Sequence, residues 1–183
     1  NPNCRVCMQA KATHVPHRRG AMKKNGQPAV NVGDVTTLDH IIARGETSKG
    51  MDGEKNCVMA YDVAADWLSA IPVKSKHANR AYNAMIQHSG RTKLRLVHSD
   101  GSKELAKACR MHGVPQETSL PNDPQGNGLA ESMVRVEKDG CRCDLTQSGH
   151  PACFWPLGVV HFAFARNIQQ RDGEGSGQQV AGH

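Results

Sequence analysis

Three short segments of the chain carry carboxylates that could perform phosphoryl-transfer chemistry together. The segments TTLDH, VHSDGSKEL and DPQGNGLAES contain Asp39, Asp100 and Glu131. The surrounding residues predict a strand for Asp39, a strand end for Asp100 and the first turn of a helix for Glu131. Such elements hold side chains rigidly, and a site for two Mg²⁺ ions about 4 Å apart needs two or three carboxylates. A nucleic acid is therefore the first substrate to consider.

Two cations accompany Glu131 on the same face of the expected helix. Arg135 and Lys138 follow it by four and seven residues, and these spacings bring side chains together on one helical face. A carboxylate for metal beside two cations for phosphate is a sensible arrangement for DNA. A single acid of this kind is most often a solvated surface group, so it is the three acids in this order that point to a site.

Composition favours a polyanionic partner and gives no sign of a membrane-spanning chain. The 183 residues, enough for one domain with short appendages, carry a net charge of +6 and a pI near 9.1. The longest apolar stretch, residues 154–165, is too short to span a bilayer and contains Pro156 and His161. The first thirty residues lack the apolar segment of a signal peptide. We therefore expect an intracellular protein with reduced thiols among its seven cysteines.

The elements that would position the three acids can be predicted from hydrophobic periodicity. Strands are expected over residues 35–39, 57–61, 67–73 and 94–98, and helices over residues 78–88, 103–112, 129–138 and 151–167. The second and third strands would form a hairpin, and residues 115–128 would be a loop. This order predicts a mixed sheet with helices packed on it.

Finer details of the helices follow from their end residues and apolar positions. Ser102 can cap the helix that starts at Lys103, and Gly113 can end it. On the helix that carries Glu131, the residues expected to point largely inward are Leu129, Met133, Val134 and Val136.

The segments together resemble the catalytic core of retroviral-type integrases, most closely that of copia-type retrotransposon integrases. The resemblance extends over residues 33–167, through GDVTTLDH, YDVAADWLSAIPVKSK, VHSDGSKEL, PNDPQGNGLAES and LTQSGHPACFWPLGVVHFAFARNI. The combination is specific, although each motif alone would be weak. It implies an α/β, ribonuclease H-like fold with a mixed five-stranded sheet flanked by helices. It also implies a DDE site in which Asp39, Asp100 and Glu131 hold two Mg²⁺ or Mn²⁺ ions.

The same resemblance implies an enzyme, a polynucleotidyl transferase that performs DNA 3′ processing and strand transfer. Its substrates would be the ends of the element's cDNA and a target DNA. The expected DNA contacts, electrostatic and weakly sequence-specific, are Arg135 and Lys138 beside the site, Lys103 and Lys107 near its rim, and Asn127 in the loop before Glu131. A homo-oligomer within a longer Pol polyprotein is expected, acting in the nucleus after a cytoplasmic particle stage and without a membrane partner.

Departures from the family pattern leave a second function open. Ser132 stands where Arg or Lys commonly follows the glutamate, and Leu105 replaces an aromatic residue. Asp139 and Gly140 are expected to end the helix early. The alternative to an active integrase is therefore a catalytically decayed or domesticated domain that binds nucleic acid, and ribonuclease or DDE transposase activity on the same fold also stays open.

The N-terminal segment carries Cys4 and Cys7, which resemble the end of the His-His-Cys-Cys zinc module of this family. Residues 1–30 are accordingly interpreted as a remnant of that module plus a linker, residues 31–170 as the core, and residues 171–183 as a disordered tail. Because the chain starts at Asn1 without Met, we expect a fragment whose Zn²⁺ site lacks its two upstream histidines. A local Cys2His2 site completed by His14 and His17 is the alternative.

The sequence also suggests roles for His40, Cys141 and Cys143. His40 would touch the metal or, in the simpler interpretation, only support Asp39 or pack. Cys141 and Cys143 were expected to point in opposite directions on a strand or irregular segment and to have a structural role.

Overall fold

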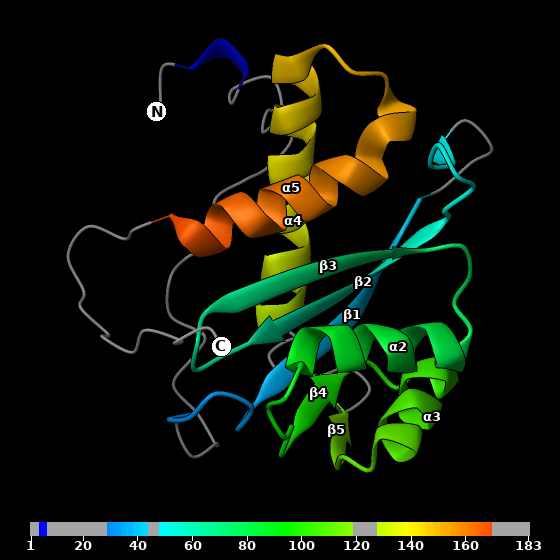
Figure 1. The fold of residues 1–183 in the computed structure, drawn as a ribbon, viewed down its shortest axis with the longest axis vertical. Helices are drawn as coiled ribbons and strands as arrows, with labels where there is room; N and C mark the ends of the chain where they lie inside the picture. The colour runs from blue at the N-terminus through cyan, green and yellow to red at the C-terminus, as the bar shows by residue number, and fades with distance from the viewer. Residues whose placement is uncertain (1–3, 7–28, 44–47, 119–127, 170–183) are drawn as a thin grey trace.

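A mixed five-stranded sheet covered by helices forms the framework of the computed structural model (Figure 1). The structure describes residues 4–6, 29–43, 48–118 and 128–169. The strand order is β3-β2-β1-β4-β5, with β1 antiparallel to β2 and parallel to β4. The strands are β1 (Thr36–Ile42), β2 (Asn56–Asp62), β3 (Trp67–Val73), β4 (Val97–Ser99) and β5 (Gln116–Thr118). The predicted mixed sheet flanked by helices is thus confirmed.

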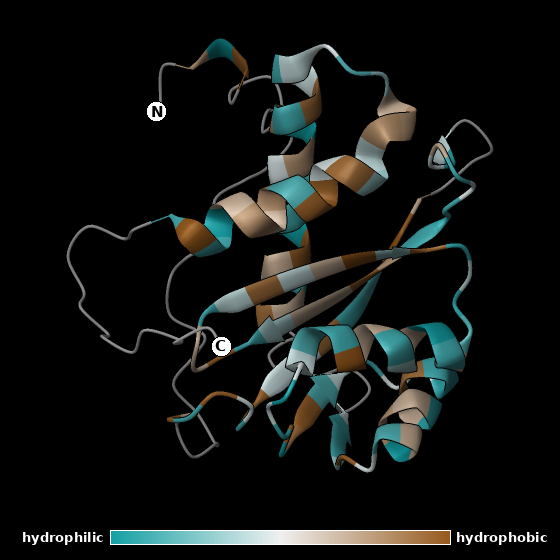
Figure 2. Cartoon of the chain, in the orientation of Figure 1, coloured by the Kyte–Doolittle hydropathy of each residue, from teal (hydrophilic) through white to brown (hydrophobic). Residues whose placement is uncertain are grey.

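Two helices cover one face of the sheet. They are α2 (Ala78–Ser89) and α3 (Lys103–His112). Their buried residues form a cluster with alternate residues of the strands, including Leu38 of β1 and Val58 of β2. In Figure 2, hydrophilic residues alternate with hydrophobic ones on both helices, as expected when one side of a helix is packed and the other is solvated.

The other two helices cover the opposite face. They are α4 (Gly128–Ser148) and α5 (Trp155–Ile168), which are joined through the short helix η2 (Ala152–Phe154). Ile41 of β1 and Met59 of β2 belong to this cluster. Side chains alternate between the two faces of a strand, so every residue of β2 is buried between the helix pairs. None of the described helices is long and apolar enough to cross a membrane.

Helix α4 is much longer than the sequence predicted. It continues through Asp139 and Gly140 to Ser148, so these residues do not end it. Cys141 and Cys143 therefore lie on a helix and not on a strand or irregular segment, and Cys141 is buried against α5. Val136 was expected to point inward but is 36% exposed. The helix continues because α5 crosses it and packs against it on either side of Gly140.

Three other local predictions also need correction. Residues 116–118 form the edge strand β5 in a segment expected to be a loop, and β4 starts only at Val97. Ser102 occupies the N-cap position of α3, but its hydroxyl makes no capping hydrogen bond. Gly113 ends α3 in a left-handed conformation, as predicted.

We expect Gly140→Ala to lower the free energy of unfolding by about 1–3 kcal/mol, the usual effect of overpacking. A Cβ at Gly140 would collide with the ring of Phe162, and this outweighs the gain of about 1 kcal/mol in helix propensity. Denaturant unfolding measures the change. Gly128→Ala in the same helix is the matched control, because a Cβ there meets nothing within 4 Å. Equal stability of Gly140→Ala and the wild type would show that α5 can move away at little cost.

Candidate active site

Asp39 in the middle of β1 lies beside Asp100, which directly follows the parallel strand β4. Leu38 of β1 is paired with Ser99 of β4, and each aspartate is the next residue along the chain. Asp39 is on the same face of β1 as Ile41, which packs under α4 and α5. Both aspartates are only partly buried, so a ligand from solvent can reach them.

Glu131 comes to this pair from the first turn of α4, where it is exposed. Burial raises the pKa of the Asp39 carboxyl, and the hydrogen bond donated by the His40 backbone N–H at 2.6 Å opposes that shift. The negative charges of Asp100 and Glu131 raise this pKa further, whereas Lys138 lowers it. Asp100, Glu131 and Lys138 are therefore each close enough to Asp39 to act on it through their charges.

The hydrogen bonds of the described residues occupy one oxygen of each aspartate. Asp39 accepts through Oδ1 from the His40 backbone, and Asp100 accepts through Oδ1 from the Ser102 backbone at 3.2 Å. The second oxygen of each carboxylate is left for another partner. Repulsion between neighbouring carboxylates is relieved when a cation binds between them.

The donor set suits a hard divalent cation that keeps part of its water shell. Among the described residues, no group of three or more His, Cys, Asp or Glu side chains is arranged to hold a metal ion by itself. Mg²⁺ is commonly bound through one or two carboxylates, with waters and substrate phosphates completing its octahedron. Asp39 and Asp100 meet that requirement, whereas Glu131 acts on Asp39 through its charge without completing a three-carboxylate group.

His40 points away from this group. It shares the opposite face of β1 with Leu38 and packs on the side of α2 and α3. Burial lowers the pKa of His40, as does the charge of Lys76, while Asp100 and Glu104 raise it. Its Nε2 is buried and has no hydrogen-bond partner in the described part of the chain. Lys76, which acts on His40 through its charge, is the last residue of YDVAADWLSAIPVKSK, and no role was predicted for it from the sequence.

The predicted cations differ in exposure, and of these only Lys138 is seen to act on Asp39 through its charge. Lys138 is exposed and Arg135 is half-buried on α4, while Lys103 and Lys107 are exposed on α3. Asn127 lies outside the described residues, as do Cys7, His14 and His17. Cys4 is described and half-buried. Because Cys7, His14 and His17 are outside the described part of the chain, the two zinc hypotheses stay predictions.

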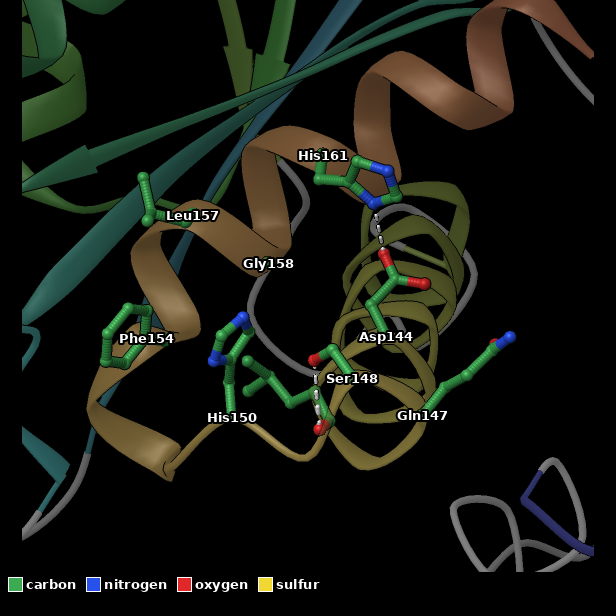
Figure 3. Close-up of a pocket in the computed structure, with 9 residues that line it drawn as sticks. Asp144, Gln147, Ser148, His150, Phe154, Leu157, Gly158 and His161 are labelled. Atoms are coloured by element: carbon green, nitrogen blue, oxygen red, sulfur yellow. Dashed lines mark hydrogen bonds and ion pairs between the residues drawn. The ribbon is translucent and has the colours of Figure 1, made fainter.

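A cavity of about 510 Å³ lies between the end of α4 and α5 (Figure 3). At one side His161 and Asp144 are paired, with Nδ1 and Oδ2 2.8 Å apart, and His150 stacks on Phe154. None of the acids or cations predicted from the sequence lines this cavity. Asp39, Asp100 and Glu131 are therefore the better candidates for chemistry.

The chain is similar to known proteins both in sequence and in fold. No family model matches the chain. The chain is 26% identical over 161 residues to the retrovirus-related Pol polyprotein from transposon TNT 1-94 of Nicotiana tabacum. This match covers 83% of the chain but only 12% of the length of that relative. In the sequence, therefore, the chain resembles a small part of a retrotransposon Pol polyprotein.

A solved structure shows the corresponding likeness in fold. The catalytic core domain of BIV integrase superimposes with a TM-score of 0.53 at 16% sequence identity. The match covers 78% of this chain and 88% of that one. The ribonuclease H-like fold of an integrase core is thus shown. Together with the Pol polyprotein match, it confirms the resemblance to an integrase catalytic core.

Proposed function

We propose that this chain is the catalytic core of a retrotransposon integrase, a polynucleotidyl transferase that processes DNA 3′ ends and joins them to a target. The observation that supports the proposal is that Asp39 in β1 lies beside Asp100, which directly follows β4, and that Glu131 acts on Asp39 through its charge. Residues 31–170 would form the core, after a zinc-module remnant in residues 1–30 and before a tail in residues 171–183.

The three carboxylates would hold two Mg²⁺ or Mn²⁺ ions. When bound, such ions lower the pKa of the attacking water or hydroxyl group and neutralise charge on the phosphate. The chain's own contribution is position: Asp39 and Asp100 are fixed by paired strands, while Glu131 lies at the start of a long helix. Precise placement of the reacting oxygen and phosphorus supplies much of the rate gain in such reactions.

The substrates proposed are the element's cDNA ends and a target DNA. In 3′ processing a water oxygen bonds to phosphorus while the bond to the 3′ oxygen breaks. In strand transfer the freed 3′-hydroxyl attacks a target phosphodiester and displaces another 3′ oxygen. Arg135, Lys138, Lys103 and Lys107, with Asn127 in the preceding loop, would position the phosphates. A homo-oligomer released from a Pol polyprotein and acting in the nucleus completes the proposal.

A catalytically decayed DNA-binding domain is the second candidate, favoured by the departures at Ser132 and Leu105. Leu105 is fully buried in the cluster beneath α2 and α3, so its side chain packs the core and does not line the site. Ser132 is exposed beside Glu131. Neither residue removes a carboxylate, and this supports the active enzyme.

A strand-transfer assay separates the two candidates. The longer protein with its upstream segment is incubated with a labelled cDNA-end duplex and a target plasmid, with Mg²⁺, Mn²⁺ or chelator. An active integrase yields joined products only with a divalent ion. DNA binding without joining under every metal condition would support the decayed domain instead.

We expect the Arg135→Ala/Lys138→Ala variant to bind DNA with a weaker salt dependence than the wild type. Each phosphate contact contributes about −0.9 to the slope of log affinity against log salt, so losing two contacts should change the slope by about 1.8. Fluorescence anisotropy of a labelled duplex at several salt concentrations measures this. The control is Lys55→Ala/Lys93→Ala, which removes two charges outside the proposed contacts. Identical slopes for both variants would contradict a DNA surface at α4.

A further inference from the structure

A second cavity lies at the start of α2. Helix α3 runs alongside α2 (Figure 1). The cavity measures about 430 Å³. The residues that line it are His77, Ala78, Asn79, Arg80, Asn83 and Lys107. All of them except Ala78 offer a side-chain hydrogen-bond donor, and none is a carboxylate. The chemistry of this lining suits an anion with several acceptor oxygens.

The two permanent cations of the cavity, Arg80 and Lys107, are not neutralised by any described residue. Neither Arg80 nor Lys107 takes part in an ion pair with another described residue, and both are exposed. Arg166 provides the contrast, because its guanidinium is held by Asp66 with Nη2 and Oδ1 2.6 Å apart. The positive charge at the cavity is therefore available to an external ligand.

The backbone of α2 adds to the positive potential. This helix has no acidic residue in its first turn and receives no side-chain cap from His77. Its first N–H groups and helix dipole therefore favour an anion at this end. No carboxylate lines the cavity, so no lining residue competes with a phosphate for these donors.

The cavity is also connected to the candidate active site. Helix α3, which supplies Lys107, begins at Lys103, three residues after Asp100. Lys76 directly precedes His77, the first residue that lines the cavity. Lys103 and Lys107 thus follow Asp100 along α3, with Glu104 as the one acidic residue of that helix. A nucleic-acid strand presents phosphates along such a path, whereas a small free anion would need only one position.

We propose that this cavity, the α2 phosphate seat, binds a backbone phosphate of the DNA at a position away from the reacting one. The inference rests on the proposed function and names an additional contact for the same substrate. Arg80 and Lys107 supply the charge, and Asn79 and Asn83 donate hydrogen bonds to phosphate oxygens. The seat fixes the direction in which the strand leaves the carboxylates without reading its sequence.

The test compares two double variants of the full chain in DNA binding. Arg80→Ala/Lys107→Ala empties the seat, whereas Arg91→Ala/Arg110→Ala removes equal charge from exposed positions near the other ends of the same helices. We expect the seat variant to reduce the salt slope by about 1 and to lower affinity about tenfold near 0.1 M salt. The control variant should change both much less. Equal effects of the two variants, or an unchanged slope in the seat variant, would overturn the seat.

Two further measurements separate the sources of failure. If the wild type performs metal-dependent strand transfer but the seat variant binds DNA normally, only the seat is wrong. If the wild type neither joins nor binds DNA, the proposed function is wrong. A titration with inorganic phosphate at constant ionic strength tests for a free anion: strong binding of phosphate that does not compete with DNA would also overturn the seat. Asn79→Asp, which places a negative charge in the cavity, should repeat the loss seen with the double variant.

Discussion

Asp100→Asn should reduce metal-dependent strand transfer at least about 100-fold while changing DNA affinity about threefold or less. A cation held between carboxylates contributes several kcal/mol to stabilising the charge of the transition state, and each 1.4 kcal/mol corresponds to about a tenfold change in rate. Asparagine keeps an oxygen that can accept the hydrogen bond from the Ser102 backbone. The loop after β4 should therefore stay in place while the negative charge is lost.

The matched control for this prediction is Asp144→Asn. Asp144 is a carboxylate of α4 that pairs with His161 and lines the cavity of about 510 Å³ between α4 and α5. Asp39, Asp100 and Glu131 do not line that cavity. Joined product is quantified on gels for wild type and variants, and DNA binding is measured by anisotropy. Near-normal joining by Asp100→Asn would remove this aspartate from the site. A comparable loss in Asp144→Asn would instead point to a general effect of carboxylate charge or to chemistry in the other cavity.

Glu137→Gln is expected to raise the free energy of unfolding by about 2–4 kcal/mol at pH 9 and to have little effect near pH 4.5. Glu137 is fully buried under α5, and neither of its oxygens has a hydrogen-bond partner among the described residues. Burial raises the pKa of this carboxyl from 4.5 to about 8, although the charge of Arg166 partly opposes the shift. The folded protein therefore holds Glu137 protonated at neutral pH.

The direction of the pH effect follows from proton binding. Between about pH 4.5 and pH 8 the unfolded chain loses the Glu137 proton and the folded chain keeps it. Stability is therefore highest below the unfolded pKa and falls as pH rises through this window. A shift of this size corresponds to at most about 5 kcal/mol, and the glutamine amide, which is also buried, retains part of the penalty.

Denaturant unfolding at pH 4.5, 7 and 9 measures the effect. Glu117→Gln on β5 is the control, because that side chain is mostly exposed and its removal should alter stability little above neutral pH. Glu137→Leu, which has no polar atoms, should be at least as stable as Glu137→Gln at pH 9. A difference in the free energy of unfolding between wild type and Glu137→Gln that is the same at all three pH values would contradict this prediction. That result would mean that Glu137 has the same pKa in the folded and the unfolded protein, and is therefore ionised in the folded protein at pH 7 and 9.

Local pattern was sufficient for several elements that position the site. The hairpin of β2 and β3 was predicted closely, because its two apolar runs are separated by a short turn between Asp62 and Asp66. Helices α2 and α3 were predicted to within one residue, since their apolar spacing and the glycines after them are local signals. The three acids could be chosen for the same reason, although their roles remain proposals.

Other features were decided by partners distant in the sequence. Strand β5 has no apolar alternation over Gln116–Thr118 and forms by pairing with β4. Helix α4 passes through Gly140 because the ring of Phe162 fills the space that a side chain would occupy. The seat at the start of α2 also depends on Lys107, which the packing of α3 beside α2 supplies.

The amino-acid sequence by itself determined which carboxylates and cations this protein carries and the type of most elements that hold them. Hydrophobic periodicity and turn residues act over a few positions, and a reader of the sequence can detect them. Only the tertiary structure decided that Asp39 and Asp100 are adjacent, that Glu131 acts on Asp39, and that Glu137 is buried without a partner. Each of these features depends on strand pairing and helix packing between residues far apart in the chain. The energies of such contacts cannot be inferred from a local sequence pattern.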